Sequence, residues 1–167
     1  MERLQDLELT NKQKEIVLEI DKKIKEFLEK KSKLIFKKEV LSKEVKIITD
    51  LYKLDNQNLS KIMMTNVSEL NEVLEVISVL KTILKYLDIM ENNYTISFKR
   101  RAIENFQGKK TKTAINELLE QDDYYIALNY VKFVYESIYL ERAHYLSETL
   151  KIYRDSISRE ITLRGLK

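Results

Sequence analysis

The sequence predicts an all-α fold: an elongated antiparallel helical bundle with a long coiled-coil-like helix at its N-terminus. Three observations lead to this prediction. Proline is absent from the 167 residues, glycine occurs twice, and apolar residues recur at helical spacing along most of the chain. Because proline breaks helix interiors, its absence means that no proline interrupts a long helix. Glycine supplies the positive φ angles of tight hairpins and Gly-rich phosphate loops, so both are nearly excluded.

The first expected element is one long helix over residues 4–54, which forms a domain of its own (1–54). Its apolar residues follow the alternating four- and three-residue spacing of a heptad seam, interrupted at Lys31 and Lys38. A helix cannot bury so narrow a stripe by itself, so we expect the stripe to pack against helices of a partner. The predicted partner-binding residues are Ile20, Ile24, Phe27, Leu34, Leu41, Val45, Ile48 and Tyr52.

The remaining residues, 55–167, are expected to form the helical bundle as a second domain. The run Asp-Asn-Gln-Asn at 55–58 separates the two domains, because Asp and Asn compete for backbone hydrogen bonds and cap helices. A second helix is expected over 59–90, with an apolar stripe wide enough to pack on two sides. Asn92 and Asn93 are expected to interrupt the helical pattern.

Shorter helices complete the expected bundle. Gly108 is expected just past the end of one of them, the usual place of a C-terminal glycine. Asp122 or Asp123 is expected to cap the helix that starts near Tyr124. The expected ranges are 94–107, 111–120, 124–140 and 143–163, and no signal in the sequence separates the last two.

No constellation of catalytic, cofactor-binding or metal-binding residues is recognisable, so the chain is expected not to be an enzyme. Cysteine is absent and His144 is the only histidine, which leaves a catalytic triad or a histidine metal site without partners. The run Gly-Lys-Lys-Thr at 108–111 is similar to the end of a P-loop. However, Ile103 stands where that motif needs glycine, so nucleotide binding is rejected.

The charge balance gives little support to nucleic-acid binding. The chain has 30 Lys and Arg against 27 Asp and Glu, a net charge of +3. One basic cluster has two interpretations. It is either a surface that binds acidic proteins or anionic lipid headgroups, or a solvated helix end. Its members are Lys99, Arg100, Arg101, Lys109, Lys110 and Lys112.

The chain is expected to be cytoplasmic. The absence of cysteine fits a reducing compartment, and the first six residues contain no apolar signal region. The most apolar stretch, about 62–90, contains three glutamates and two lysines. A bilayer-spanning segment would not tolerate these charges, so no integral membrane segment is predicted.

One segment resembles a known family. Residues 114–128 read Ala-Ile-Asn-Glu-Leu-Leu-Glu-Gln-Asp-Asp-Tyr-Tyr-Ile-Ala-Leu. They are similar to an element of vesicle-tethering subunits, in which a short helix ends at an Asp-Tyr turn and the next helix opens with Tyr-x-x-Ala-Leu. The expected order of a coiled-coil stripe, a long amphipathic helix and this hairpin also resembles the N-terminal half of helical-rod tether subunits. Within that group the chain resembles the second or fourth subunit of the conserved oligomeric Golgi complex, although it is shorter.

The resemblance implies a non-enzymatic structural subunit of a multisubunit vesicle-tethering complex in Golgi transport, peripheral on the Golgi membrane. Such a subunit assembles with sister subunits through helix–helix contacts and engages SNARE and Rab proteins, with no cofactor and no small-molecule substrate. Ile24→Asp together with Leu41→Asp is then expected to abolish partner binding. The residues leave two other classes open: a prokaryotic or phage helical protein that binds a host protein or nucleic acid, and a homodimeric coiled-coil adaptor.

Overall fold

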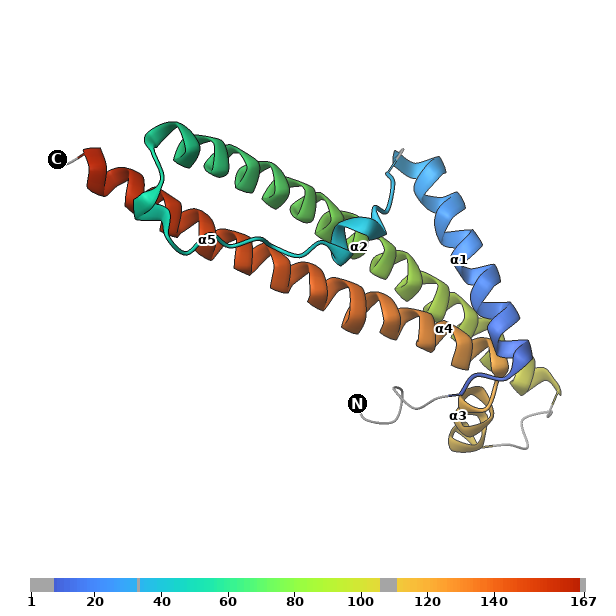
Figure 1. The fold of residues 1–167 in the computed structure, drawn as a ribbon. Coiled ribbons are helices and arrows are strands. Elements are labelled where there is room, and N and C mark those ends of the chain that lie inside the picture. The colour runs from blue at the N-terminus through green and yellow to red at the C-terminus, as the bar shows by residue number, and fades with distance from the viewer. Residues whose placement is uncertain (1–7, 33, 106–110, 166–167) are drawn as a thin grey trace. The chain divides into compact units, whose positions relative to one another are not determined.

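The computed structural model describes residues 8–32, 34–105 and 111–165 (Figure 1). These ranges hold helices of the α, 3-10 and π types and no β-strand, which confirms the predicted all-α class. The α-helices are α1 (Asn11–Ser32), α2 (Asn56–Asn105), α3 (Lys112–Glu120), α4 (Asp123–Phe133) and α5 (Glu141–Gly165). Two 3-10 helices, η1 (Lys38–Ser42) and η2 (Leu51–Lys53), precede α2, and a π-helix, η3 (Val134–Leu140), joins α4 to α5.

Contacts divide the chain into two compact units. Unit 1 comprises Met1–Ile35 and Lys81–Ile138, and unit 2 comprises Phe36–Leu80 and Tyr139–Lys167. The N-terminal half of α2 therefore belongs to unit 2 and its C-terminal half to unit 1. The predicted domain boundary at residue 54 does not coincide with this division.

Unit 1 combines α1, α3, α4 and the C-terminal half of α2. α1 packs closely on α4. Ala127 of α4 is fully buried, and its small side chain leaves room for helix backbones to approach. α2 and α4 run in opposite directions: Glu91 of α2 pairs with Lys132. Farther along α2, Tyr94 contacts Asp122, which precedes α4. The core residues of this unit are Ile20, Ile24, Leu28, Ile83, Leu87, Ala102, Ile115, Leu119, Ala127, Leu128 and Val131.

The prediction that the helical pattern stops at Asn92 and Asn93 is wrong. α2 is one helix of 50 residues, and both asparagines are exposed within it. An exposed Asn costs a helix at most about 0.7 kcal/mol relative to alanine. Tyr94 and Ala102 lie on the same stretch of α2 and pack into unit 1. Their packing outweighs the low helix propensity of the two asparagines.

The hairpin of α3 and α4 follows the prediction closely. The Thr111 side chain caps α3 by accepting a hydrogen bond from the backbone N–H of Ala114. The Asp122 carboxylate caps α4 by accepting from the backbone N–H groups of Tyr124 and Tyr125, at 3.0 and 3.1 Å. Of the two predicted caps, Asp122 is therefore the one observed. Gly108, the predicted helix end, lies outside the described residues.

Unit 2 pairs the N-terminal half of α2 with α5, and residues 36–54, which we name the strap, lie against both helices. α2 and α5 run in opposite directions, because Asn66 contacts Leu150 while Asn56 contacts Arg164. The strap contributes three residues to the core of this unit, and the two helices contribute the rest. The core residues are Val40, Leu41, Leu51, Leu59, Leu70, Val73, Val76, Ile77, Val79, Leu80, Ala143, Leu146, Leu150, Tyr153 and Ile157.

The prediction of a single long helix over 4–54 is wrong. α1 spans Asn11–Ser32, and the strap holds only the short helices η1 and η2 between stretches without regular structure. Residues 45–49, Val-Lys-Ile-Ile-Thr, include four β-branched residues, which lose χ1 freedom in a helix. The long coiled-coil helix and its continuous heptad seam are therefore absent from the described residues.

Chain length gives a second reason why the strap is not helical. The strap meets the continuous run of η3 and α5 near both of its own ends, since Phe36 contacts the Tyr139 ring of η3 and Leu54 accepts a hydrogen bond from Arg164 of α5. The helical path from residue 139 to residue 164 is about 38 Å long at 1.5 Å per residue. Residues 36–54 would span only about 27 Å as an α-helix. Only a more extended chain reaches both contacts.

α4, η3 and α5 follow one another without a gap. This agrees with the absence of any break signal near Glu141. The seven-residue π-helix was not part of the prediction, because a π-turn keeps the same apolar composition as the α-helix around it and shifts only the hydrogen-bond register.

Candidate functional site

Side chains of α5 hold the strap by its backbone. The Arg142 Nε donates to the carbonyl oxygen of Leu41 at 3.2 Å, and its Nη2 donates to that of Lys43 at 3.5 Å. The Tyr153 hydroxyl accepts a hydrogen bond from the backbone N–H of Ile48 at 3.1 Å. Because these bonds use backbone groups, they fix the path of the strap whatever its side chains are.

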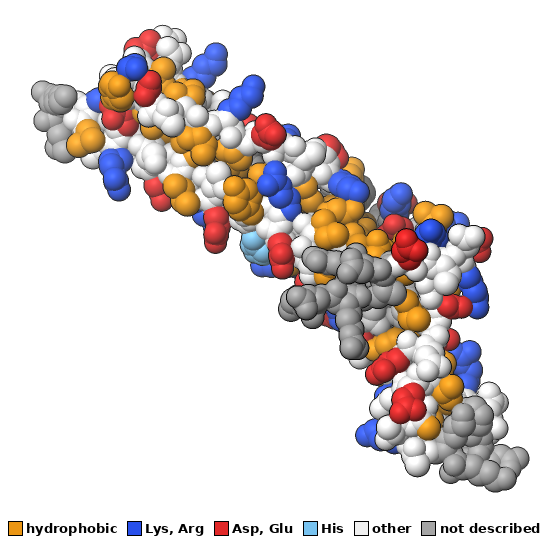
Figure 2. Space-filling view, turned by 60° about the horizontal axis from the view of Figure 1, so that its bottom comes forward, with side chains coloured by type: hydrophobic (Ala, Val, Ile, Leu, Met, Phe, Trp, Pro, Cys, Tyr) orange, Lys and Arg blue, Asp and Glu red, His pale blue; other side chains and the backbone are white. Residues whose placement is uncertain are grey.

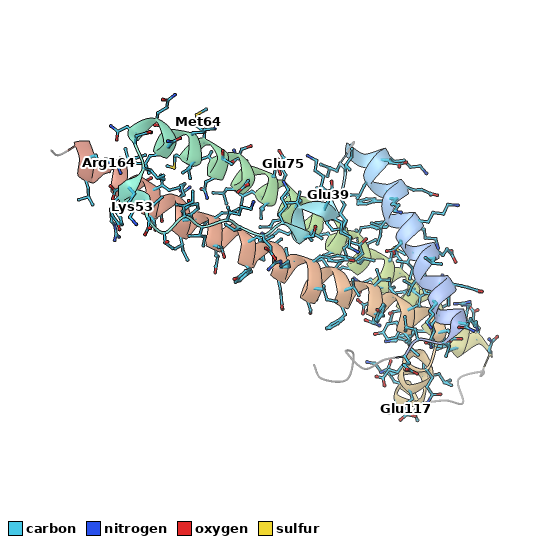
Figure 3. All side chains as sticks on the ribbon, viewed as in Figure 1. Glu39, Lys53, Met64, Glu75, Glu117 and Arg164 are labelled. Atoms are coloured by element: carbon cyan, nitrogen blue, oxygen red, sulfur yellow. The ribbon has the colours of Figure 1, made fainter. Side chains whose placement is uncertain are left out.

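A second arginine holds the C-terminal end of the strap. The Arg164 guanidinium donates to the carbonyl oxygen of Leu51 at 3.0 Å and to that of Leu54. Glu160 accepts from the Arg164 Nε at 2.9 Å and orients the guanidinium. Figure 3 shows Arg164 near the end of α5, with Lys53 of the strap close by.

Arg142, Tyr153 and Arg164 follow one another at intervals of 11 residues. Eleven residues make three turns of an α-helix, so the three side chains share one face of α5. We name this the backbone-holding face. Sequence reasoning missed it because two arginines and a tyrosine on a charged helix have no distinctive pattern until an extended segment lies beside them.

The eight predicted partner-binding residues fall into three groups. Ile20, Ile24 and Leu41 are buried inside the chain, with exposed fractions of 0, 1 and 7%. Phe27, Leu34 and Val45 are half-buried, and the Phe27 ring stacks on Tyr86 at 4.1 Å between centroids. Ile48 and Tyr52 are exposed, at 40 and 65%. The chain's own helices cover much of the predicted stripe, and a role in partner binding stays a prediction for all eight residues.

A row of exposed isoleucines runs along α2 within unit 1. Ile89, Ile96 and Ile103 are 56, 60 and 54% exposed and follow at seven-residue intervals. Residues seven apart lie on the same side of a helix, so the three side chains form one column. We name it the isoleucine row. The heptad spacing of these residues was the signal in the sequence, but their solvent exposure was not evident from it.

A second exposed apolar row lies on α5 within unit 2. Tyr145, Ile152 and Leu163 are 62, 69 and 52% exposed, and we name them the α5 row. Figure 2 shows hydrophobic side chains among the charged ones on the face that it draws. Single exposed apolar residues are common on protein surfaces, whereas contiguous apolar patches often mark binding sites.

A cavity of about 510 Å³ lies in unit 2 between the strap and α2. The strap lines it with residues between Lys43 and Ile48, α2 lines it with residues between Lys61 and Glu69, and α5 contributes Tyr153. Asn66 forms part of the lining and is itself only 2% exposed. This volume falls within the range of typical ligand pockets.

A hydrogen-bonded tyrosine supports the cap of α4 in unit 1. The Tyr94 hydroxyl donates to the Asp122 carboxylate at 2.7 Å, and its ring packs on Tyr124 at 4.5 Å between centroids. Burial, together with the hydrogen bond to Asp122 and that group's negative charge, raises the pKa of Tyr94 to about 12. An ionised Tyr94 would repel the carboxylate that caps α4.

The raised pKa of Tyr94 predicts a loss of stability in alkali. An unfolded tyrosine ionises near pH 10, so the contribution of neutral Tyr94 is complete below that pH and is lost as the pH rises toward about 12. Urea unfolding at a series of pH values should show the free energy of unfolding falling in this window. Tyr94→Phe should fall less steeply. Equal slopes for the two proteins would show that Tyr94 does not ionise differently on folding.

Two clusters of ion pairs join the helices of unit 1. Lys132 of α4 lies 2.5 Å from Asp88 and 2.8 Å from Glu91 of α2. Burial alone would lower the pKa of Lys132, but hydrogen bonds and attraction to the two carboxylates outweigh burial and raise it. Asp123 accepts hydrogen bonds from Lys12 and Gln13 of α1, which hold the pKa of its carboxyl below its usual range. Asp88, Glu91 and Asp123 therefore serve to connect helices through ion pairs.

The other candidates from the sequence do not assemble into a chemical site. His144 is exposed on α5. No group of three or more His, Cys, Asp or Glu side chains suited to a metal occurs within the described ranges. Of the basic cluster, Arg100, Arg101 and Lys112 are exposed and Lys99 is half-buried; Lys109 and Lys110 lie outside the described residues. None of the helices in those ranges is long and apolar enough to cross a membrane.

Comparison of the chain with protein-family models, with curated proteins and with solved structures finds no match.

Proposed function

We propose that the chain is a non-enzymatic scaffold that binds a helix of another protein along the isoleucine row of α2. The observation that carries the proposal is the column of three isoleucines, each more than half exposed, on a helix whose opposite face is buried. Seven-residue spacing of apolar side chains is the pattern by which two helices pack along one another. An amphipathic helix is therefore the partner element that fits this column.

The size of the row indicates how such a partner would be held. Complete burial of an isoleucine contributes about 1.5–3 kcal/mol, so three that are roughly half exposed contribute about 2.5–5 kcal/mol together. Loss of translational and rotational freedom on association costs about 4–15 kcal/mol. The row alone gives a weak contact, so stable binding needs further surface beside it. This favours a subunit that makes several contacts in an assembly over a pair held by one seam.

The narrower proposal is a vesicle-tether subunit that assembles with sister subunits at the Golgi and engages SNARE and Rab proteins. It is supported by the Asp-Tyr hairpin at 114–128, in which Asp122 caps α4 and Ala127 is buried. The long coiled-coil helix that completed the resemblance is absent from the described part of residues 4–54. The helical hairpin is therefore the remaining support for this narrower proposal.

Partner capture with matched surface variants tests the proposed function. The tagged chain is expected to retain a defined set of proteins from native cells, and Ile89→Ser, Ile96→Ser and Ile103→Ser together should remove them. The control is the same change in the α5 row: Tyr145→Ser, Ile152→Ser and Leu163→Ser. All six residues are exposed, so both variants should keep the fold, which circular dichroism checks. Equal capture by the wild type and the isoleucine variant would contradict the proposal.

A further inference from the structure

Polar side chains border the isoleucine row on both of its sides. On a helix the neighbours of a residue lie three and four positions away, so one residue stands on either side of each gap between successive isoleucines. Asn92 and Asn93 border the first gap, and Lys99 and Arg100 border the second. Lys85 stands four residues before the row. We name these five residues the flanks; Lys99 is half-buried and the other four are exposed.

The cations of the flanks have no acidic partner in the part of the chain that the structure describes. Lys85, Lys99 and Arg100 form no ion pair there. Two carboxylates of α2 are turned toward Lys132 of α4. Glu104 stands four residues after Arg100, a spacing that allows an ion pair, but the two side chains do not form one. The flanks therefore carry positive charge that the fold leaves without a partner.

The two asparagines indicate what kind of surface covers the row. Asn92 and Asn93 are exposed in the middle of α2, where asparagine is a weaker helix former than alanine, leucine or lysine. A polar amide beside an apolar seam fixes the register of two packed helices, because it forms a hydrogen bond to a polar side chain at the same level. The acyl region of a bilayer offers no such partner and would remove the hydrogen bonds of the amides to water. The asparagines therefore favour a protein helix over a lipid surface.

We infer that the partner helix proposed for the isoleucine row is acidic, an inference that rests on the proposed function. Apolar residues of that helix lie on the row, and its Asp or Glu side chains pair with the cations of the flanks. A polar side chain lies opposite Asn92 and Asn93, about 10 Å along the helix from the level of Lys99 and Arg100. The ion pairs supply the further surface that the row needs. Lys99 and Arg100 also belong to the basic cluster, for which an acidic protein is one of the two interpretations.

Nuclear magnetic resonance with two designed helical peptides tests the inference. The acidic probe is EEAALAAQQAALAAEEAAL, acetylated and amidated at its ends, with leucines at seven-residue intervals and glutamines to face the asparagines. The basic probe has lysine in place of every glutamate. We expect the acidic probe to shift the isoleucine methyl signals of the row in the full chain at millimolar concentration. Each exposed ion pair strengthens binding about twofold and each like-charged pair weakens it similarly. The basic probe should therefore bind at least about tenfold more weakly, with a smaller difference at high salt.

The outcomes separate this inference from the proposed function. Equal affinities for the two probes, or a preference for the basic one, would overturn the inference and leave a helix on the row. No shift of the row with either probe at several millimolar would contradict the proposed function, and the inference with it. Vesicles of phosphatidylserine and phosphatidylcholine are the third probe. Shifts of the row with these vesicles but with neither peptide would indicate a membrane-binding face and would also overturn the inference.

A matched pair of variants assigns the preference to the flanks. Lys85→Glu with Arg100→Glu should reduce the advantage of the acidic probe over the basic probe at least about fivefold. Lys61→Glu with Arg159→Glu is the control, because it makes the same change in net charge in unit 2. All four residues are exposed, and the methyl spectrum of each variant checks its folding before titration. An equal reduction in both variants would mean that the net charge of the chain sets the preference, which would overturn the inference.

Discussion

Ile24→Asp is expected to unfold unit 1. Ile24 is 1% exposed and faces the core formed by α1, α2 and α4. A carboxylate at this position would have no partner, and burial of an unpaired charge together with loss of apolar packing destabilises a domain by more than about 4 kcal/mol. Circular dichroism during urea unfolding should show loss of helix at low urea, or no cooperative transition.

Leu18→Asp on the same helix is the matched control. Leu18 is 69% exposed, so an aspartate there remains solvated and should change stability by no more than about 0.5 kcal/mol. If Ile24→Asp unfolded no more easily than Leu18→Asp, the packing of α1 described above would be wrong. Ile24→Asp with Leu41→Asp is therefore unsuitable as a test of partner binding, because both residues are buried and loss of binding would follow from loss of the fold.

Arg142→Ala combined with Arg164→Ala is expected to release the strap from α5. Hydrogen bonds from charged donors contribute about 1.5–3 kcal/mol each when buried and less when partly exposed. The two arginines together should stabilise the strap by about 2–4 kcal/mol. Hydrogen exchange of the Ile48 amide, which donates to Tyr153, should then become roughly 30- to 700-fold faster. Trypsin should also cleave sooner after Lys43 and Lys46.

Arg154→Ala combined with Arg159→Ala is the control for this release. Both residues lie on α5, but Arg154 pairs with the adjacent Asp155 and Arg159 is exposed. Neither donates to the strap, so exchange at Ile48 should stay at the wild-type rate. Unchanged exchange in the Arg142 and Arg164 variant would mean that apolar packing of Val40, Leu41 and Leu51 holds the strap without the arginines.

The sequence predicted those features, such as helix caps, that depend only on residues close together in the chain. The cap at Asp122 or Asp123 could be predicted because a cap depends on residues within one turn. The first helix was predicted too long because its apolar spacing also suits a strap that buries Val40, Leu41 and Leu51 at intervals. The distinction depends on the length of α5, a feature more than 80 residues away in the chain.

The candidate surfaces were less predictable than the fold. Ile89, Ile96 and Ile103 have a visible heptad spacing, but only the packing of α2 in unit 1 shows that this face is exposed. The cavity beside Asn66 is lined by residues of the strap, α2 and α5, which are far apart in the sequence, so no local pattern predicts it. Tyr153 lies in the range 143–163 that was predicted only to be helical, and it acts in both the core and the backbone-holding face.

Site-specific photo-crosslinking in native cells tests the proposed scaffold function most directly. One variant carries a photoreactive residue at position 96 of the isoleucine row, and a second carries it at position 152 of the α5 row. The native side chains at these two positions are similarly exposed. We expect one defined protein to be crosslinked from position 96, at a contact that lies in a helix of that protein, and not from position 152. No crosslink from position 96, or the same products from both positions, would contradict the proposal.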